Sequence, residues 1–265
     1  GGFAVVGLTE SFGAGGGDAY LVKYSSGGQV EWEKTYGGVK AEFAWSVLQA
    51  SDGGFALAGY TESFGAQGRD AYLVRTDAAG ELVWQKTVGG IAWDQATCLV
   101  EAADGGFVVA GQTRSPALPA YDAYVFKVTS AGDLVWTLSF GGADDEYITG
   151  LAESSDGSLF LSGTTTSFGA GSYDGYAARV SADGTLVWEQ AYGTAGIETF
   201  EAMDLAADGG IIAAGYTEET PGGQEDLYVA KLDVDGNAVW EWRLGGETNE
   251  AAYAGWPVVA TEIDE

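Results

Sequence analysis

Acidic side chains that recur at one fixed spacing are the residues of this sequence best suited to chemistry. Each stands just before a predicted strand, and they follow one another at intervals of 52 residues: Glu42, Asp94, Glu146, Glu198 and Glu250. Carboxylates gathered around one axis at about 6 Å would repel by roughly 3 kcal/mol per neighbouring pair at an effective dielectric of 20. They must be hydrated, capped by backbone donors, protonated or neutralised by a cation such as Ca²⁺, which prefers oxygen ligands. A solvated or capped rim and a cation- or ligand-binding site therefore both remain open.

A second set of candidate binding residues is aromatic. The sequence Ser-Phe-Gly-Ala places a phenylalanine in three glycine-rich loops, at Phe12, Phe64 and Phe168. These rings could stack on a sugar or on a partner protein, or fold back as a lid on their own sheet. The loops are not phosphate-binding loops, because no helix follows them and no lysine stands where a nucleotide needs one.

Composition excludes several classes of function. The chain has no histidine and a single cysteine, Cys98, so the commonest general base is missing and the thiol has no histidine to activate it. The formal charge of −28 argues against nucleic acids and anionic membranes as partners, since both need basic patches. No apolar run is long enough to span a bilayer, so we expect no membrane insertion.

The positions of these residues follow from an internal repeat that fills the chain. Glycine pairs, or Gly-Ser in the fourth copy, begin at residues 1, 53, 105, 157 and 209. The same step separates the aspartates at 18, 70, 122, 174 and 226 and the tryptophans at 32, 84, 136, 188 and 240. In the second copy, residues 44–50, 55–60, 71–76 and 82–86 have the composition of strands and are separated by turns.

Four short strands in each repeat of about 50 residues indicate a propeller blade. The sequence therefore predicts an all-β, five-bladed β-propeller with four antiparallel strands per blade, and an open β-solenoid is the alternative. The chain is expected to form one domain whose blades comprise residues 1–38 with 251–265, 39–90, 91–142, 143–194 and 195–250. In this scheme the C-terminal segment closes the ring, because residues 254–262 parallel residues 44–52 and supply the inner strand that the first copy lacks.

The recurrent residues also have expected structural roles. Each tryptophan should wedge between adjacent blades, and each recurrent aspartate should accept backbone N–H groups of the loop before it. A basic residue also recurs, as in Lys23 and Arg75, and we expect it to meet an acid on a neighbouring blade.

At the Gly-x-x-x-Trp of residues 80–84 and 132–136, the unit resembles PQQ-type propeller repeats. With Asp-Gly-Gly-Phe, Ser-Phe-Gly-Ala-Gly, Asp-Ala-Tyr and Trp-Glu-Lys-Thr-Tyr-Gly-Gly, the whole unit is similar to the β-propeller repeats of bacterial and archaeal secreted and cell-surface proteins. The resemblance implies a propeller fold and an extracellular or cell-surface location. It implies no quinone cofactor, since nothing here matches the active-site residues of quinoprotein dehydrogenases.

Three functions are compatible with this sequence. The first is a monomeric, non-catalytic binding or scaffold module for a protein or carbohydrate, without a cofactor unless the acidic residues hold calcium. The second is a lectin-like module with aromatic-floored sugar sites. The third is a five-bladed glycoside hydrolase, which the sequence disfavours because the paired acids of such enzymes need different environments, whereas these acids recur in similar settings.

Overall fold

The computed structural model of the protein describes residues 1–116, 118–218, 223–246 and 248–249, which form β-strands and turns but no helix. Accordingly, none of these residues belongs to a helix long and apolar enough to cross a membrane. The chain divides into two compact units: Gly1–Pro119 with Tyr124–Thr137, and Ala120–Ala123 with Leu138–Glu265. The predicted closing strand, in residues 251–265, and Glu250 lie outside the described residues.

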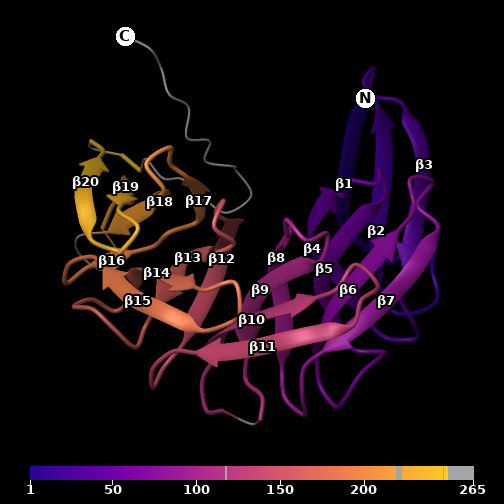
Figure 1. The fold of residues 1–265 in the computed structure, drawn as a ribbon, viewed down its shortest axis with the longest axis horizontal. Coiled ribbons are helices and arrows are strands. Elements are labelled where there is room, and N and C mark those ends of the chain that lie inside the picture. The colour runs from indigo at the N-terminus through magenta and orange to yellow at the C-terminus, as the bar shows by residue number, and fades with distance from the viewer. Residues whose placement is uncertain (117, 219–222, 247, 250–265) are drawn as a thin grey trace. The chain divides into compact units, whose positions relative to one another are not determined.

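The first part of the chain forms antiparallel sheets whose strands run side by side in chain order (Figure 1). The first sheet has the order β1-β2-β3, with β1 (Gly2–Thr9), β2 (Asp18–Ser25) and β3 (Val30–Tyr36). The second has the order β4-β5-β6-β7, with β4 (Glu42–Gln49), β5 (Phe55–Thr61), β6 (Asp70–Thr76) and β7 (Leu82–Val88). The third comprises β8 (Asp94–Glu101), β9 (Phe107–Thr113), β10 (Asp122–Val128) and β11 (Leu134–Phe140), and the last two of these strands contain residues of both units.

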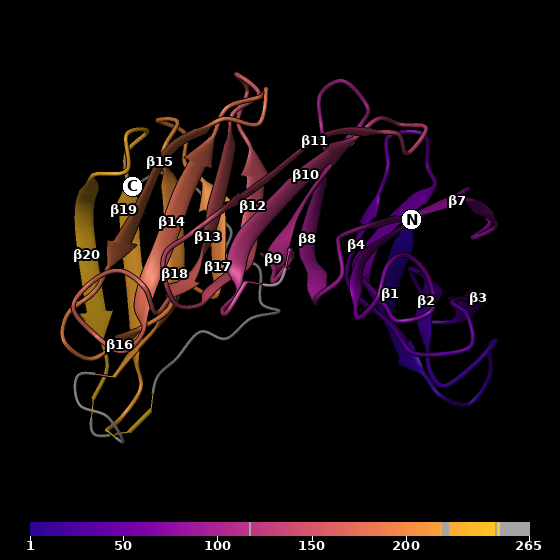
Figure 2. The same ribbon diagram turned by 90° about the horizontal axis from the view of Figure 1, so that it is seen from below.

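The second unit repeats this arrangement, which the turned view in Figure 2 shows for both of its sheets. One sheet has the order β12-β13-β14-β15, with β12 (Glu146–Glu153), β13 (Leu159–Thr165), β14 (Asp174–Val180) and β15 (Leu186–Tyr192). The other contains β16 (Ile197–Glu198), β17 (Ala202–Leu205), β18 (Ile211–Glu218), β19 (Asp226–Leu232) and β20 (Ala238–Leu244), and both β16 and β17 pair with β18. The prediction of four-stranded antiparallel sheets is thus confirmed for the sheets that begin with β4, β8 and β12.

The repeated Asp-Gly-Gly motif makes the tight turn between the first two strands of a sheet. In the second sheet the N–H of Gly53 donates to the carbonyl of Ala50 at 2.8 Å, and Gly53 has a φ of +90°. A side chain rarely adopts this backbone conformation, so the turn requires glycine.

One feature of strands β4, β8 and β12 was not predicted. The strand pairing skips one residue between Ala44 and Ser46, and the same shift occurs at the equivalent place in β8 and β12. Each shift is a β-bulge, and the bulged residue of the second sheet is Trp45. In the last sheet the irregularity is larger and divides the strand into β16 and β17.

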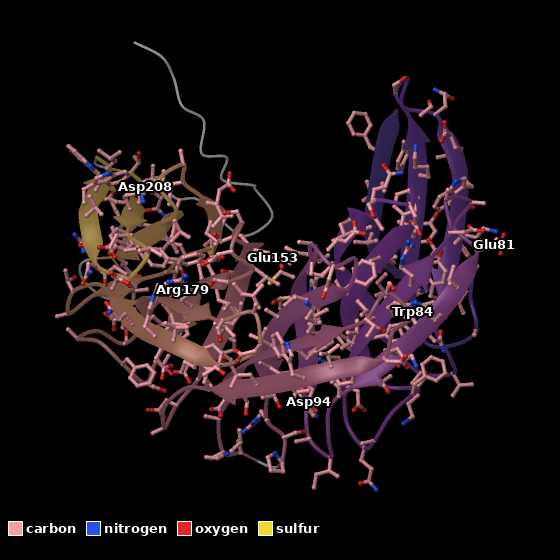
Figure 3. The ribbon with its side chains drawn as sticks, in the orientation of Figure 1. Glu81, Trp84, Asp94, Glu153, Arg179 and Asp208 are labelled. Carbon is pink, nitrogen blue, oxygen red and sulfur yellow. The ribbon has the colours of Figure 1, made fainter. Side chains whose placement is uncertain are left out.

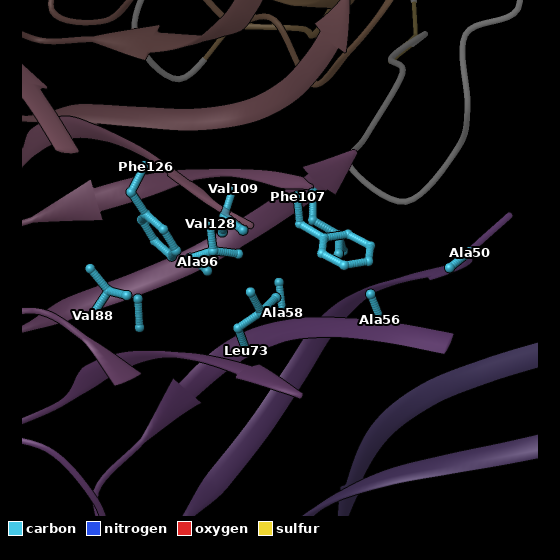
Figure 4. Packing of buried hydrophobic residues seen from close by; sticks show 12 residues of the cluster. Ala50, Ala56, Ala58, Leu73, Val88, Ala96, Phe107, Val109, Phe126 and Val128 are labelled. Atoms are coloured by element: carbon cyan, nitrogen blue, oxygen red, sulfur yellow. The ribbon is translucent and has the colours of Figure 1, made fainter. Parts of the chain in front are cut away.

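The apolar cores lie between neighbouring sheets. Strand β5 is buried on both faces: Phe55 and Leu57 pack with the first sheet, whereas Ala56 and Ala58 pack with the third. Large residues of the third sheet, including Phe107 and Val109, fill the space above these alanines (Figure 4). Pairing large with small side chains lets two twisted sheets approach closely without leaving cavities.

The recurrent tryptophans Trp84 and Trp188 join one repeat to the next, as predicted. The Trp84 ring, labelled in Figure 3, lies on β7, and its Nε1–H donates to the carbonyl of Ser130 at 3.0 Å. The ring also packs edge-on against Phe107, at a centroid distance of 6.1 Å. A Cβ on Gly132 would lie only 3.0 Å from the indole, so the next repeat needs glycine at that turn. Trp188 makes the equivalent hydrogen bond to Val234 in the second unit.

The prediction for the recurrent basic residues is wrong. Their partner is the aspartate of the Asp-Gly turn in their own sheet rather than an acid of a neighbouring one. The pairs are Arg75 with Asp52, Lys127 with Asp104, Arg179 with Asp156 and Lys231 with Asp208. Strand pairing within the sheet explains this result, because it brings the end of the third strand beside the turn that starts the second.

Replacing Trp84 by alanine should destabilise the protein by about 3 kcal/mol, because the change removes a large packed side chain and a hydrogen bond between two sheets. Urea denaturation followed by circular dichroism measures the loss. Val83→Ala on the same strand is the control, since Val83 is 60% exposed. Equal losses for both variants would contradict the proposed joining role of Trp84.

Candidate functional site

The recurrent carboxylates are hydrogen-bond acceptors buried at the ends of the sheets. Glu42 is fully buried, and its Oε1 accepts hydrogen bonds from the hydroxyl of Thr61 at 2.7 Å and from the N–H of Ser63 at 3.1 Å. Its Oε2 accepts from the N–H of Gly38 at 2.6 Å. One side chain therefore ties the end of the first repeat to a strand and a loop of the second.

The equivalent acids of the later repeats have the same surroundings. Asp94 accepts hydrogen bonds from the N–H of Gly90 and the hydroxyls of Thr113 and Ser115. Glu146 accepts from Gly142 and Thr165, and Glu198 accepts from Thr194 and Thr217. All three acids have no solvent exposure.

This burial shows how the charge of these acids is accommodated, a point that the sequence left open. Of the solvated or capped rim that the sequence predicted, the structure shows the capped form for Glu42, Asp94, Glu146 and Glu198, because each carboxylate is buried and accepts hydrogen bonds from the protein. Their role in ligand binding stays a prediction, and that of Glu250 concerns a residue outside the described ones.

The structure also pairs each of these acids with a second carboxylate across a glycine. A Cβ placed on Gly37 would lie 2.2 Å from Asp18 Oδ1 and 2.4 Å from Glu42 Oε2, so the two oxygens are separated by no more than the sum of these distances. The same arrangement recurs as Asp70 with Asp94 at Gly89, Asp122 with Glu146 at Gly141, and Asp174 with Glu198 at Gly193. Glycine is required at these positions because a Cβ would lie 2.6 Å or less from at least one of the two carboxylates.

The recurrent aspartates of these pairs cap the loops before them, as predicted. The N–H groups of Ala14 and Ala66 each donate to the aspartate four residues later, at 3.0 Å. Burial raises the pKa of Asp70 to about 6; the hydrogen bond from Ala66 opposes this shift, and the charge of Asp94 adds to it. Burial likewise raises the pKa values of Glu146 and Asp174, with a contribution from the facing acid of each pair.

Two carboxylates are fewer than a structural metal site usually supplies. No group of three or more Asp, Glu or Cys side chains suited to a metal ion occurs in the described part of the chain. Cys98 is also a poor ligand, because burial raises the pKa of its thiol to about 12 and so disfavours the thiolate.

The three loop phenylalanines fold back onto the tyrosine that follows the capping aspartate of their own sheet. Phe12 packs edge-on against Tyr20, whereas Phe168 stacks on Tyr176 with an interplanar angle of 9°. Phe64 packs against Tyr72 and lines a shallow depression with it, Gln85 and Lys86. The structure thus shows that these rings fold back as a lid on their own sheet. Ligand binding by them stays a prediction.

A partly exposed cluster that the sequence analysis missed lies on β4 and β5 and just before β6 and β8. The guanidinium of Arg69 lies 4.3 Å from the ring centroid of Tyr60 and 4.6 Å from that of Trp93, and its Nε pairs with Glu62 at 2.9 Å. The rings of Trp45 and Tyr60 are in contact, at a centroid distance of 5.2 Å. One signal could have found this cluster: Trp45, Arg69 and Trp93 stand where the neighbouring repeats carry other residue types.

Replacing Asp70 by asparagine should stabilise the protein at pH 7 by about 1 to 2 kcal/mol and have little effect at pH 4. Between its ordinary pKa near 4 and its folded value of about 6, Asp70 holds more protons folded than unfolded. Its contribution to the free energy of unfolding is therefore complete below this window and is lost as the pH rises through it. Asparagine keeps the acceptor for Ala66 and offers a neutral donor to Asp94.

Urea denaturation at both pH values measures this difference. Glu10→Gln serves as the control, because it removes one negative charge at an exposed position. If the difference in the free energy of unfolding between Asp70→Asn and wild type is the same at pH 4 and pH 7, the protonation of Asp70 does not affect stability.

The comparisons with known proteins agree with the observed architecture. The family model described as a β-propeller domain of unknown function, DUF5122, matches residues 154–186 and 206–238. Over 201 residues the chain is 26% identical to "Regulatory protein FlaEY" of Caulobacter vibrioides; the match covers 65% of this chain but only 21% of that protein.

Two solved structures share the fold at low sequence identity. The Pan2 WD40 domain of Neurospora crassa is 12% identical with a TM-score of 0.54, over 86% of this chain and 62% of that one. Sqt1 from Chaetomium thermophilum is 13% identical with a TM-score of 0.50, over 89% of this chain and 55% of that one. With its sheets of antiparallel strands, the chain is a β-propeller repeat protein.

Proposed function

We propose that the chain is a non-catalytic, five-bladed β-propeller binding module in which the sheets form a closed ring and one face holds the ligand. In this proposal the protein is monomeric and acts outside the cell or at its surface. No cofactor takes part, since the oxygens of the recurrent acids already accept hydrogen bonds from the protein.

A difference between repeated and non-repeated residues carries this proposal. The repeated polar residues are engaged inside the fold: Glu42 caps three segments, and Arg75 binds the turn of its own sheet. The non-repeated Trp45 and Trp93 remain 42% and 49% exposed. A large exposed aromatic side chain contributes nothing to a core, and such groups characterise binding surfaces.

The acid pairs make catalysis the weaker alternative. Two adjacent carboxyl groups with one raised pKa are the arrangement that acid–base enzymes use. Here, however, Asp70 is 2% exposed and Asp94 is fully buried, so a substrate could not reach them. Their recurrence in successive repeats also fits a role in holding loops, which every repeat needs.

Two classes of ligand fit a binding module of this kind. A protein partner is favoured by the similarity to a protein described as regulatory, although the match spans about a fifth of that protein. A carbohydrate is favoured by the exposed aromatic side chains. The charge of −28 makes nucleic acid unsuitable for either role.

The purified chain should bind ligand without converting it. Incubation with a panel of aryl glycosides should release no product above the level of heat-denatured protein, and light scattering should give the mass of one chain. Release of product that disappears in Asp94→Asn, with the folded state of the variant verified by circular dichroism, would show that the protein is an enzyme.

A further inference from the structure

We propose that a neutral oligosaccharide binds on a platform formed by Trp45, Tyr60, Arg69 and Trp93. This inference rests on the proposed binding function and assigns it a site and a class of ligand. We call these four residues the aromatic platform. All of them belong to the first compact unit.

The aromatic platform is a continuous row of flat groups. Trp45 packs against Tyr60 at a ring-centroid distance of 5.2 Å, and the guanidinium of Arg69 lies 4.3 Å from the Tyr60 ring. The same guanidinium lies 4.6 Å from the ring of Trp93, so Arg69 is in contact with both rings. Several flat groups in series suit a chain of sugar rings, because each pyranose has an apolar C–H face that packs on an aromatic ring.

The backbone places these side chains away from the buried acids. Phe43 and Tyr60 are cross-strand partners on β4 and β5, whereas the buried Glu42 pairs with Thr61 on the opposite face. Trp45 is the bulged residue of β4, and a bulge turns a side chain away from the regular alternation. In β8 and β12 the bulged residue is a threonine whose hydroxyl bonds to backbone carbonyls. The tryptophan is therefore not needed to make the bulge.

Charge determines which ligands fit this surface. The positive charge of Arg69 is balanced by Glu62, whose Oε1 lies 2.9 Å from Nε. The platform is thus neutral although the whole chain carries −28. A strongly charged ligand would find no opposite net charge on this surface. A neutral polyhydroxylated ligand does not need one. The guanidinium and the carboxylate still offer donors and acceptors at the edge of the platform.

A buried amide without a partner for its oxygen lies on the same face of the third sheet as Trp93. Gln112 pairs with Gln95, two residues beyond Trp93, so Gln112 and Trp93 share one face of the third sheet. Gln112 is 5% exposed, and its Oε1 accepts no hydrogen bond from the described residues. An unpaired buried acceptor is unfavourable, and Oε1 is itself inaccessible, so a ligand hydroxyl can donate to it only after the Gln112 side chain turns outward. A proline-rich peptide could stack on the same rings but would offer few groups to pair with the guanidinium and the carboxylate at the edge of the platform.

The test measures binding of neutral oligosaccharides to the whole chain. An array of gluco-, xylo-, manno- and chito-oligosaccharides identifies the strongest binder, and calorimetry gives its dissociation constant. Trp45→Ala and Trp93→Ala should each weaken binding by about tenfold or more, as expected for exposed aromatic anchors. Arg69→Lys keeps the ion pair but loses the planar group, and it should weaken binding several-fold. Melting temperatures should change little in the tryptophan variants.

Two controls make the result specific. Trp242→Ala removes a tryptophan that is 56% exposed in the second unit, and Phe64→Ala removes a ring of the loop set. Both should bind the oligosaccharide like wild type. If Phe64→Ala alone abolishes binding, the loop phenylalanines form the site and the platform proposal is overturned.

The remaining outcomes separate this inference from the proposed function. If the wild type binds no oligosaccharide on the array, the platform does not bind neutral sugars, while a binding module for protein remains supported. If the oligosaccharide is bound and cleaved, the non-catalytic function fails. Loss of affinity in Trp45→Ala and Trp93→Ala would then still place the sugar on the platform.

Discussion

Each sheet of this protein has two apolar faces, and a single repeat cannot bury both. In β5 the large side chains lie on one face of the sheet and the small ones on the other. Phe55 and Leu57 pack on the first face, and Ala56 and Ala58 pack on the second. In the first unit the small side of the second sheet receives the large side of the third, so these repeats depend on one another. Trp84 strengthens the same contact, because it packs on Phe107 and binds the carbonyl of Ser130.

The buried carboxylates are a consequence of this stacking. Neighbouring sheets bring the glycine-rich end of one repeat beside the first strand of the next, where several backbone N–H groups need acceptors. Glu42 satisfies Gly38 and Ser63 together with the hydroxyl of Thr61. Removing a carboxylate from water is costly, and charged hydrogen bonds from several donors offset that cost. The close approach of Asp18 adds repulsion, which glycine at position 37 leaves room to accommodate.

Repetition also separates structural from functional residues in this chain. Residues that the fold of every sheet requires recur, and these include the capping aspartates, the turn glycines and the joining tryptophans. The fold does not require Trp45, Arg69 and Trp93, since neighbouring repeats fold with other residues at these positions. Their exposure and mutual contacts make them the part of the described surface best suited to distinguish one ligand from another.

The repeat made the strands, the tight turns, the role of the tryptophans and the capping by aspartate predictable from sequence. These features depend on residues close along the chain or on one contact repeated in every sheet. The surroundings of Glu42 were not predictable in the same way, because its donors come from residues 38, 61 and 63 and meet only when two sheets pack. The same holds for the pairing of Asp70 with Asp94 and for Arg69 between Tyr60 and Trp93. Sequence therefore determined which residues recur, whereas the packing of sheets decided which acids are buried and which aromatic rings stay exposed.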